Sequence, residues 1–160
     1  LKSGKELEAD IIVTATGFHL NVLGDIQFEI DGKPLDFSQT VTYRGMMFTG
    51  VPNMAWVFGY FRASWTLRAD LIAAYIGRMV AYMRRHGFDS VTAIRDPTVG
   101  EMPFIDFNSG YVLRALPLLP KQGDRFPWRI HQNYLRDLFI TLFSRLRDPA
   151  LRFGRREGSA

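Results

Sequence analysis

The residues between Asp10 and Gly17 have the composition of a strand that ends at a ligand site. Ile11 to Val13 is a continuous apolar run, which is typical of a strand buried on both faces of a parallel sheet. The run ends at Thr16 and Gly17, where small side chains leave the backbone accessible. Ligands of α/β sheets bind beyond the carboxyl ends of strands, so this end is a candidate cofactor contact. An ordinary exit from a strand into a loop explains the same residues.

A second candidate lies where an apolar run meets a long helix. Residues 54–58 are predicted to form a buried strand, Gly59 follows, and a helix begins near Ser64. The first amides of a helix have no partner within it and together carry about half a positive charge. They would stabilise negative charge on a ligand beside the turn. A helix that is capped in the ordinary way and packed in the core is the alternative.

Several other kinds of site are excluded by residue type. The chain has no cysteine, which excludes disulfides, Cys-ligated zinc and a dithiol redox centre within it. His19, His86 and His131 have no second ligand at metal-binding spacing, so no metal site is assigned. No Gly-x-Gly-x-x-Gly follows a predicted strand, so both dinucleotide-binding fingerprints are missing. No side chain stands out as a catalytic acid, base or nucleophile.

Hydrophobic periodicity predicts the elements that would position these residues. The clearest is a helix over 64–86, which ends before Gly87. Its apolar stripe recurs every fourth residue, at Leu67, Leu71, Tyr75, Met79 and Met83. A hairpin is predicted at Asp31-Gly32, after the alternating residues 26–30. The remaining expectations are strands over 8–16, 46–48, 54–58 and 91–94, helices over 109–116 and 132–147, and loops over 97–108 and 120–128.

The composition fits one globular domain or a piece of a larger one. The chain has 160 residues, of which 47 % are hydrophobic. Its net charge of +4 owes much to arginines near the C-terminus, which indicates a solvated basic end and no nucleic-acid partner. Residues 71–83 are too few to span a bilayer, and no signal peptide is visible, so we expect a cytoplasmic protein without a transmembrane segment. Because the chain begins with Leu1 and enters a strand almost at once, we expect it to be part of a longer polypeptide.

Two segments resemble the flavin-containing and Baeyer–Villiger monooxygenases, which are class B flavoprotein monooxygenases. The family's linker strand, where the chain returns from the NADPH domain to the FAD domain, is matched by Asp10, Ala15, Thr16, Gly17 and Phe18. Residues 50–59 match its Gly-x-Pro-Asn-Leu-x-x-x-x-Gly strand, and residues 61–70 are similar to the subgroup that activates thioamide drugs in mycobacteria. The resemblance runs from about residue 6 to 93 and resumes at 109–111, 120–123 and 127–129.

The resemblance implies an α/β fold that is the C-terminal part of a flavoprotein with two dinucleotide-binding domains. Short strands would pack against one long helix, followed by a helical C-terminal extension. The implied divisions are a linker strand (1–18), the C-terminal part of the FAD-binding domain (19–93) and the extension with its basic tail (94–160). The implied cofactors are FAD and NADPH, with cofactor contacts at Thr16, Gly17, Gly59, Tyr60, Ala63, Ser64, Trp65, Thr66 and Leu67. Phe61, Arg62 and Trp65 would contact a small apolar substrate, with plain packing or a surface position as the alternative.

The activity that the resemblance implies belongs to the intact enzyme. It would use NADPH and O2 to insert one oxygen atom into a ketone, or to oxidise a sulfur or nitrogen centre, through a C4a-(hydro)peroxyflavin. The family's Phe-x-Gly-x-x-x-His-x-x-x-Trp signature is absent here and lies upstream in the family, as do the fingerprints. The chain is therefore predicted to need the N-terminal FAD- and NADPH-binding part as its partner and to be inactive alone. The alternatives are an FAD-dependent NAD(P)H reductase of the same fold, or a non-catalytic, truncated interaction module.

Overall fold

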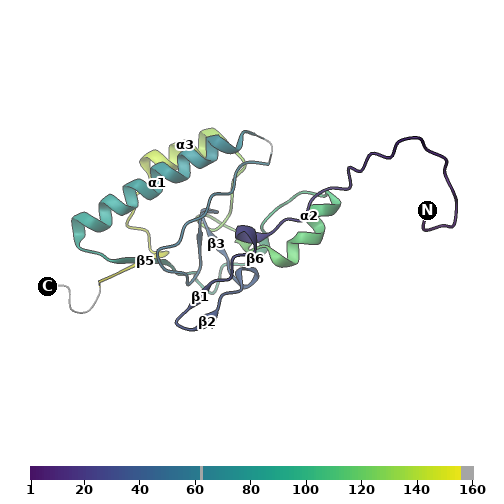
Figure 1. Ribbon diagram of the computed structural model, residues 1–160. Coiled ribbons are helices and arrows are strands. Elements are labelled where there is room, and N and C mark those ends of the chain that lie inside the picture. The colour runs from purple at the N-terminus through teal and green to yellow at the C-terminus, as the bar shows by residue number, and fades with distance from the viewer. Residues whose placement is uncertain (62, 156–160) are drawn as a thin grey trace.

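The structure, a computed structural model, describes residues 1–61 and 63–155 (Figure 1). Its helices in this part of the chain are α1 (Trp65–His86), α2 (Gly110–Ala115) and α3 (Tyr134–Phe143), with 3-10 turns η1 (Val22–Asp25), η2 (Phe37–Gln39) and η3 (Leu116–Leu118). Its strands are β1 (Glu29–Ile30), β2 (Lys33–Pro34), β3 (Thr42–Tyr43), β4 (Met47–Phe48), β5 (Ser90–Ala93), β6 (Glu101–Pro103), β7 (Lys121–Gly123) and β8 (Leu151–Gly154). They pair antiparallel as β1-β2, β3-β4, β5-β8 and β6-β7, which makes a small α/β domain.

The predicted hairpin and the predicted long helix are both confirmed. Asp31 and Gly32 have φ angles of 52° and 74°, the left-handed conformations that a tight turn between β1 and β2 requires. The long helix α1 begins after Ser64 and ends where Gly87 adopts the left-handed conformation with φ 66°. The amide of Phe88 then donates to the Met83 carbonyl at 2.9 Å, which closes the last turn.

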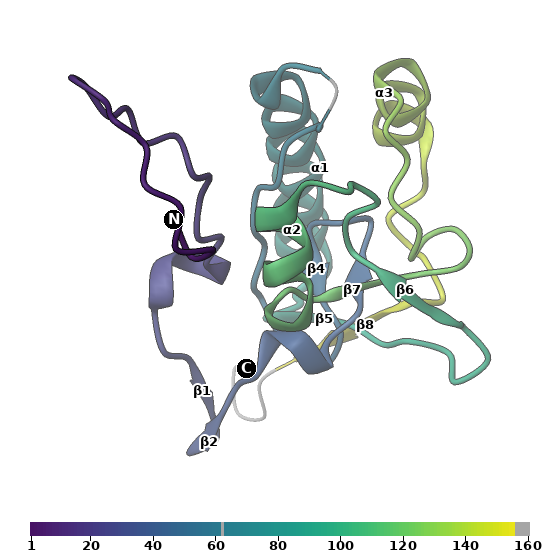
Figure 2. The same ribbon diagram turned by 90° about the vertical axis from the view of Figure 1, so that its right-hand side faces the viewer.

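The buried face of α1 covers the short strands. Ile72, Tyr75 and Met79 pack in one core cluster with residues of β3, β4, β5 and β8. A second cluster lies under α2 and contains Phe48 and Trp56. Beside α1 runs α3, and the two helices rise from the same side of the strands (Figures 1 and 2). The fold thus places the turn before α1 close to α3.

The strand predicted over residues 8–16 is wrong for this chain. These residues are extended and belong to none of the sheets in the described part of the chain. Ile11, Ile12 and Val13 are 82 %, 82 % and 84 % exposed, and the segment runs away from the body of the molecule (Figure 1). A continuous apolar run is buried on both faces only where neighbouring strands and covering layers are present. Neither lies against this segment here.

Three further expectations differ from the structure. Residues 54–58 are not a strand, although the amide of Trp56 donates to the Met46 carbonyl at 2.9 Å. The region after residue 94 is less helical than expected, because β6 and β7 form within the predicted loops and β8 pairs with β5. The last helix, α3, ends at Phe143, short of the predicted end at residue 147. Strands this short are fixed by distant partners and leave no local period in the sequence.

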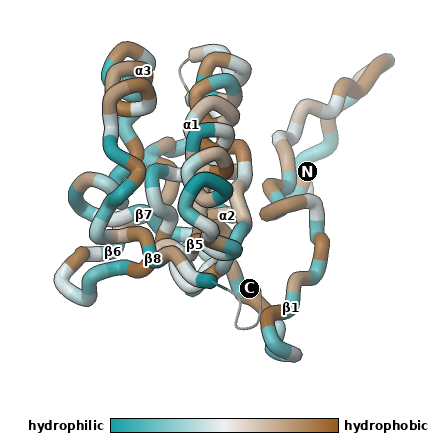
Figure 3. Tube along the Cα trace, turned by 90° about the vertical axis from the view of Figure 1, so that its left-hand side faces the viewer, coloured by the Kyte–Doolittle hydropathy of each residue, from teal (hydrophilic) through white to brown (hydrophobic). Residues whose placement is uncertain are grey.

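Two apolar surfaces are exposed. One is the extended N-terminal segment, and the other is the outer face of α3 (Figure 3). On α3, the exposed side chains are Leu135, Phe139, Leu142 and Phe143. Among the described residues, no helix combines the length and the apolar character that crossing a membrane requires.

Candidate functional site

The turn between Phe58 and α1 is built around one glycine. A Cβ atom on Gly59 would lie only 2.2 Å from Cγ of Trp65, a distance that no real side-chain contact allows. Gly59 is itself buried, and Trp65 is the first residue of α1. The indole ring therefore packs over the turn only because residue 59 has no side chain.

Aromatic rings form one wall of this turn. The ring of Phe58 lies 5.1 Å from that of Trp65 and 5.2 Å from that of Phe61. Phe104 meets Phe58 edge-on, with 5.0 Å between the ring centroids. Phe61 is also nearly parallel to Phe107, at 6.4 Å and an interplanar angle of 12°. Because Trp65 is 52 % exposed, a flat apolar molecule can reach this wall.

The N-terminus of α1 is exposed beside the aromatic wall. Ser64 occupies the N-cap position, but its side chain makes no capping hydrogen bond. Its hydroxyl lies 2.8 Å from the hydroxyl of Thr66 instead. Ala63, Ser64, Trp65 and Thr66 are all exposed. The first amides of α1 are therefore left without a side-chain cap and can donate to a polar or anionic group.

Tyr60 fastens the turn to α3. Its hydroxyl donates to Oδ2 of Asp137 at 2.7 Å, and Nη1 of Arg68 lies 3.2 Å from the same oxygen. Nη2 of Arg68 donates to the carbonyl of Arg44 at 3.0 Å. Burial raises the pKa of Tyr60, and its hydrogen bond to Asp137 raises that pKa further. The phenol therefore stays protonated and acts as a structural donor.

A cavity of about 550 Å³ opens next to Phe61. Phe104 and Phe107 line its apolar side, while Arg129 and Gln132 contribute polar groups. The backbone amide of Phe61 donates to Oε1 of Gln132 at 3.0 Å, which ties the turn to the segment before α3. The lining is therefore mixed, with aromatic rings for the body of a small molecule and polar groups that can orient it.

The structure brings together most of the predicted site residues. Gly59, Tyr60, Phe61 and Trp65 meet in the turn, and Ala63, Ser64, Thr66 and Leu67 lie at the start of α1. Arg62 lies outside the described residues.

Thr16 and Gly17 lie elsewhere. Gly17 lies against the Tyr111 side chain, and the neighbouring Phe18 ring meets Tyr111 edge-on at 5.7 Å. In the described part of the chain, no hydrogen bond or ring contact joins Thr16 or Gly17 to the turn. Tyr111 and Phe61 do pack against the same core cluster, so the two groups share a support.

Sequence reasoning missed several residues of this site. Phe104 and Phe107 lie in a segment predicted only as a loop, and Asp137 and Gln132 lie in or before the last helix. One signal was available: Arg68 falls on the buried stripe of α1, three residues before Leu71. A charge on such a stripe requires a partner from elsewhere in the chain.

Metal ligands do not gather in the described residues. No group of three or more His, Cys, Asp or Glu side chains there is arranged to hold a metal ion.

The chain is similar in sequence to several named monooxygenases. The chain is 50 % identical over 157 residues to the FAD-containing monooxygenase EthA of Mycobacterium tuberculosis, covering 98 % of this chain. It is 46 % identical over 158 residues to the probable FAD-binding monooxygenase AlmA of an Acinetobacter species. It is 39 % identical over 154 residues to the putative FAD-containing monooxygenase MymA of M. tuberculosis. No family model and no solved structure matches the chain.

The match covers only part of these relatives. The chain spans 32 %, 32 % and 31 % of EthA, AlmA and MymA respectively. In each of them the matching region is the C-terminal part. The chain is therefore a homologue of the C-terminal third of proteins named as FAD-containing monooxygenases.

Proposed function

We propose that this chain forms one wall of the flavin site of an FAD- and NADPH-dependent monooxygenase. The rest of the site would come from an N-terminal FAD- and NADPH-binding part of the same enzyme. The observation that carries the proposal is the exposed, uncapped N-terminus of α1 beside an aromatic wall. The names of relatives that are 39–50 % identical support the same class of cofactor.

The residues at the start of α1 fit the polar edge of a flavin. The amides of Trp65, Thr66 and Leu67 would hold that edge, because the first turn of a helix offers donors that have no intrahelical partner. The same amides favour negative charge, which a reduced flavin carries. Bound FAD, reduced by NADPH, would supply the activation of O2. The chain itself contributes position and electric field, without a catalytic acid or base.

The aromatic side of the turn fits a small apolar substrate. Phe61 and Trp65 present rings on which such a molecule can stack, next to the cavity that Phe104 and Phe107 line. The hydrogen bonds of Tyr60 and Arg68 to Asp137 hold the turn against α3. Arg62 remains a proposed substrate contact, and Thr16 and Gly17 remain proposed cofactor contacts. The oxygen would go to a ketone, a sulfur centre or a nitrogen centre.

A chimeric enzyme tests the proposal. The chain replaces the matching C-terminal third of the M. tuberculosis EthA protein, to which it is 50 % identical. We expect the purified chimera to retain bound FAD, seen in its visible absorption, and to couple NADPH oxidation to oxygenation of an added thioether. A reductase would oxidise NADPH and leave the thioether unchanged. A chimera that folds without retaining FAD would favour the interaction module, to which the exposed apolar surfaces also point.

A matched pair of variants in the chimera tests the role of the helix amides. Thr66→Pro removes one backbone donor from the first turn of α1 without breaking an intrahelical bond. Thr66→Ala removes the same side chain and keeps the donor. Because a hydrogen bond to a charged group contributes about 1.5–3 kcal/mol, we expect Thr66→Pro to weaken FAD binding about tenfold or more. Equal FAD affinity of the two variants would show that these amides do not touch the flavin.

A further inference from the structure

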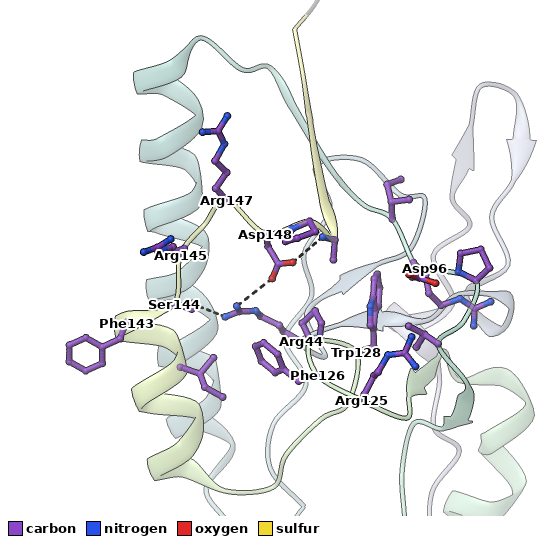
Figure 4. A pocket seen from close by; sticks show the side chains of 18 of the residues that line it. Arg44, Asp96, Arg125, Phe126, Trp128, Phe143, Ser144, Arg145, Arg147 and Asp148 are labelled. Atoms are coloured by element: carbon purple, nitrogen blue, oxygen red, sulfur yellow. Dashed lines mark hydrogen bonds and ion pairs between the residues drawn. The ribbon is translucent and has the colours of Figure 1, made fainter.

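A second cavity lies away from the turn before α1. It has a volume of about 910 Å³ and is bounded by the end of β5, the loop before β6, residues 125–128 and the segment after α3. Figure 4 shows Arg44 near its centre, with Trp128 and Arg125 on one side and Arg145 and Arg147 on the other. None of the site residues discussed above lines this cavity, apart from Arg44, whose carbonyl is bonded to Arg68.

Arg44 is a buried cation with unused hydrogen-bonding capacity. The residue is only 8 % exposed. Its Nη1 donates to Oγ of Ser144 at 2.9 Å, but its Nη2 is 3.8 Å from Oδ2 of Asp148, beyond hydrogen-bonding distance. Its Nε is buried and has no hydrogen-bond partner in the described part of the chain. A guanidinium has five donors, so a buried one with a single close acceptor is unusual.

The carboxylate of Asp148 is already engaged by other groups. It accepts hydrogen bonds from the hydroxyl of Tyr43 and from the amide of Ala150, each at 2.9 Å. The Arg44 guanidinium instead stacks over aromatic rings, at 4.7 Å from the centroid of Tyr75 and 5.2 Å from that of Phe126. The charge of Arg44 is therefore only partly neutralised by the chain itself.

The lining as a whole carries an excess of positive charge. Five arginines (Arg44, Arg95, Arg125, Arg145 and Arg147) and two aspartates (Asp96 and Asp148) line the cavity, a formal excess of three. Arg95 is held by Glu101 at 2.7 Å, while Arg125 forms an ion pair with Asp124 at 3.9 Å and donates to the carbonyl of Thr98. Among the described residues, Arg145 and Arg147 have neither an ion pair nor a hydrogen bond from their side chains.

The rest of the lining is aromatic and apolar. The Trp128 ring is 2 % exposed and belongs to the core, so its face towards the cavity is rigid. Phe126, Phe139 and Phe143 are exposed side chains of the same lining. Arginines beside aromatic rings bind planar acids well, because the guanidinium pairs with the anion while the rings cover the body.

We propose that this cavity binds an organic anion that carries a carboxylate or phosphate group on a flat apolar body. Arg44 takes the acidic group, with Arg125 and Arg147 at the rim adding to the attraction. Phe126 and Phe139, which are exposed, pack on the body of the ligand, and the buried Trp128 supports the lining from the core. This site is separate from the proposed flavin site, and the proposal does not depend on the activity of the intact enzyme.

Calorimetric titration of the 160-residue chain tests the proposal with four probes. They are 2-naphthoate, 2-naphthyl phosphate, 2-naphthamide and inorganic phosphate. We expect at least one of the two naphthyl anions to bind about tenfold or more tightly than the neutral amide and than inorganic phosphate, with an affinity that falls as salt is added. The tighter of the two anions identifies the acidic group. The proposal is overturned if neither naphthyl anion binds more tightly than 2-naphthamide, or if neither binds at all.

Variants locate the binding to this cavity. Arg44→Met should abolish detectable anion binding, and Arg147→Gln should weaken it several-fold. The matched control Arg84→Gln removes an exposed arginine of α1 that does not line the cavity, and it should leave the affinity unchanged. If Arg44→Met fails to fold, the double variant Arg125→Gln/Arg147→Gln replaces it, with circular dichroism confirming its fold. Unchanged affinity in the folded variants, or an equal loss in Arg84→Gln, overturns the proposal.

Discussion

At the scale of single residues, Gly59 controls the shape of the turn before α1. A Cβ atom there would overlap the Trp65 ring, so Gly59→Ala forces the indole or the backbone to move. Overpacking of this kind costs about 1–3 kcal/mol, and we expect the free energy of unfolding in urea to fall by that amount.

The control is Gly77→Ala, in the middle of α1, where an added Cβ meets nothing within 4 Å. That change should raise the free energy of unfolding by about 0.5–1 kcal/mol. A Gly59→Ala variant as stable as Gly77→Ala would contradict the geometry.

The fold alters the ionisation of Asp137, which lies in α3. Burial raises the pKa of Asp137 above its ordinary value of 3.8, by more than the Tyr60 hydroxyl and the Arg68 guanidinium lower it. The folded chain therefore binds this proton more tightly than the unfolded chain. The stability that follows is fully present below the unfolded pKa, and it is lost as the pH rises through the raised folded-state pKa.

The variant Asp137→Asn isolates this effect. We expect the difference in unfolding free energy, parent minus Asp137→Asn, to decrease as the pH is raised from about 3.8 upwards. Urea titrations at a series of pH values measure it. Asp70→Asn removes the same charge from the exposed side of α1 and reports the effect of net charge alone. A difference that stays constant or grows with pH would show that the ion pair with Arg68 outweighs burial.

At the scale of elements, a side chain of α1 caps the C-terminal end of α3. The guanidinium of Arg78 donates from Nη1 to the carbonyl of Thr141 and from Nη2 to that of Ser144, the latter at 2.8 Å. These carbonyls lie at the C-terminal end of α3, where helical partners run out. A cationic donor there also complements the helix dipole.

Removing that cap should loosen the end of α3. Arg78→Met keeps the length of the side chain and loses both donors, so we expect a cost of about 1–3 kcal/mol in unfolding free energy. Amide hydrogen exchange should accelerate at residues 140–144 and stay unchanged in β5. The control Arg85→Met removes an exposed arginine from the last turn of α1. Uniform acceleration across the chain would argue against a local capping role.

Some of these elements could be predicted from the sequence, because the signals that define them lie in consecutive residues. Neighbouring residues determine the apolar stripe of α1 and its end at Gly87. They also determine the hairpin turn at Asp31-Gly32. The pairing of β6 with β7 joins residues 101–103 to residues 121–123, and no short-range pattern encodes it. The strand predicted over residues 8–16 was wrong for a related reason. Ile11 to Val13 have the composition of a strand that is covered on both faces, but nothing in the described chain covers them.

In the candidate site, too, the residues close together in sequence were predicted and the distant ones were not. The turn from Gly59 to Trp65 was predicted because its residues are adjacent in sequence and resemble a known motif. The groups that hold the turn in place, Asp137 and Gln132, come from about 70 residues further along the chain. Only folding brings them to Tyr60 and Phe61, so the contacts that fix the geometry of the turn could not be predicted from neighbouring residues.

At the scale of the whole molecule, the chain has more apolar surface than its own core uses. The outer face of α3 and the extended N-terminal segment are both exposed (Figure 3). The chain spans about a third of the curated relatives that it matches. The proposed partner, the N-terminal FAD- and NADPH-binding part, would supply the strands that a run such as Ile11 to Val13 is built to join. The proposed partner thus accounts for the exposed N-terminal segment.

The N-terminal segment allows a test of this partnership that does not depend on activity. Ile12 is 82 % exposed and pairs with no strand of the described chain. Ile12→Asp should therefore leave the free energy of unfolding of the chain within about 0.5 kcal/mol of the parent. When the chain is co-expressed with the N-terminal two-thirds of EthA, the same change should abolish co-purification, because a buried strand cannot accept an unpaired carboxylate. Leu118→Asp, at an exposed position in η3, serves as the control and should still co-purify. If Ile12→Asp co-purifies as well as the control, the segment does not join the partner's sheet. A loss of stability in the chain alone would mean that the segment packs against its own domain.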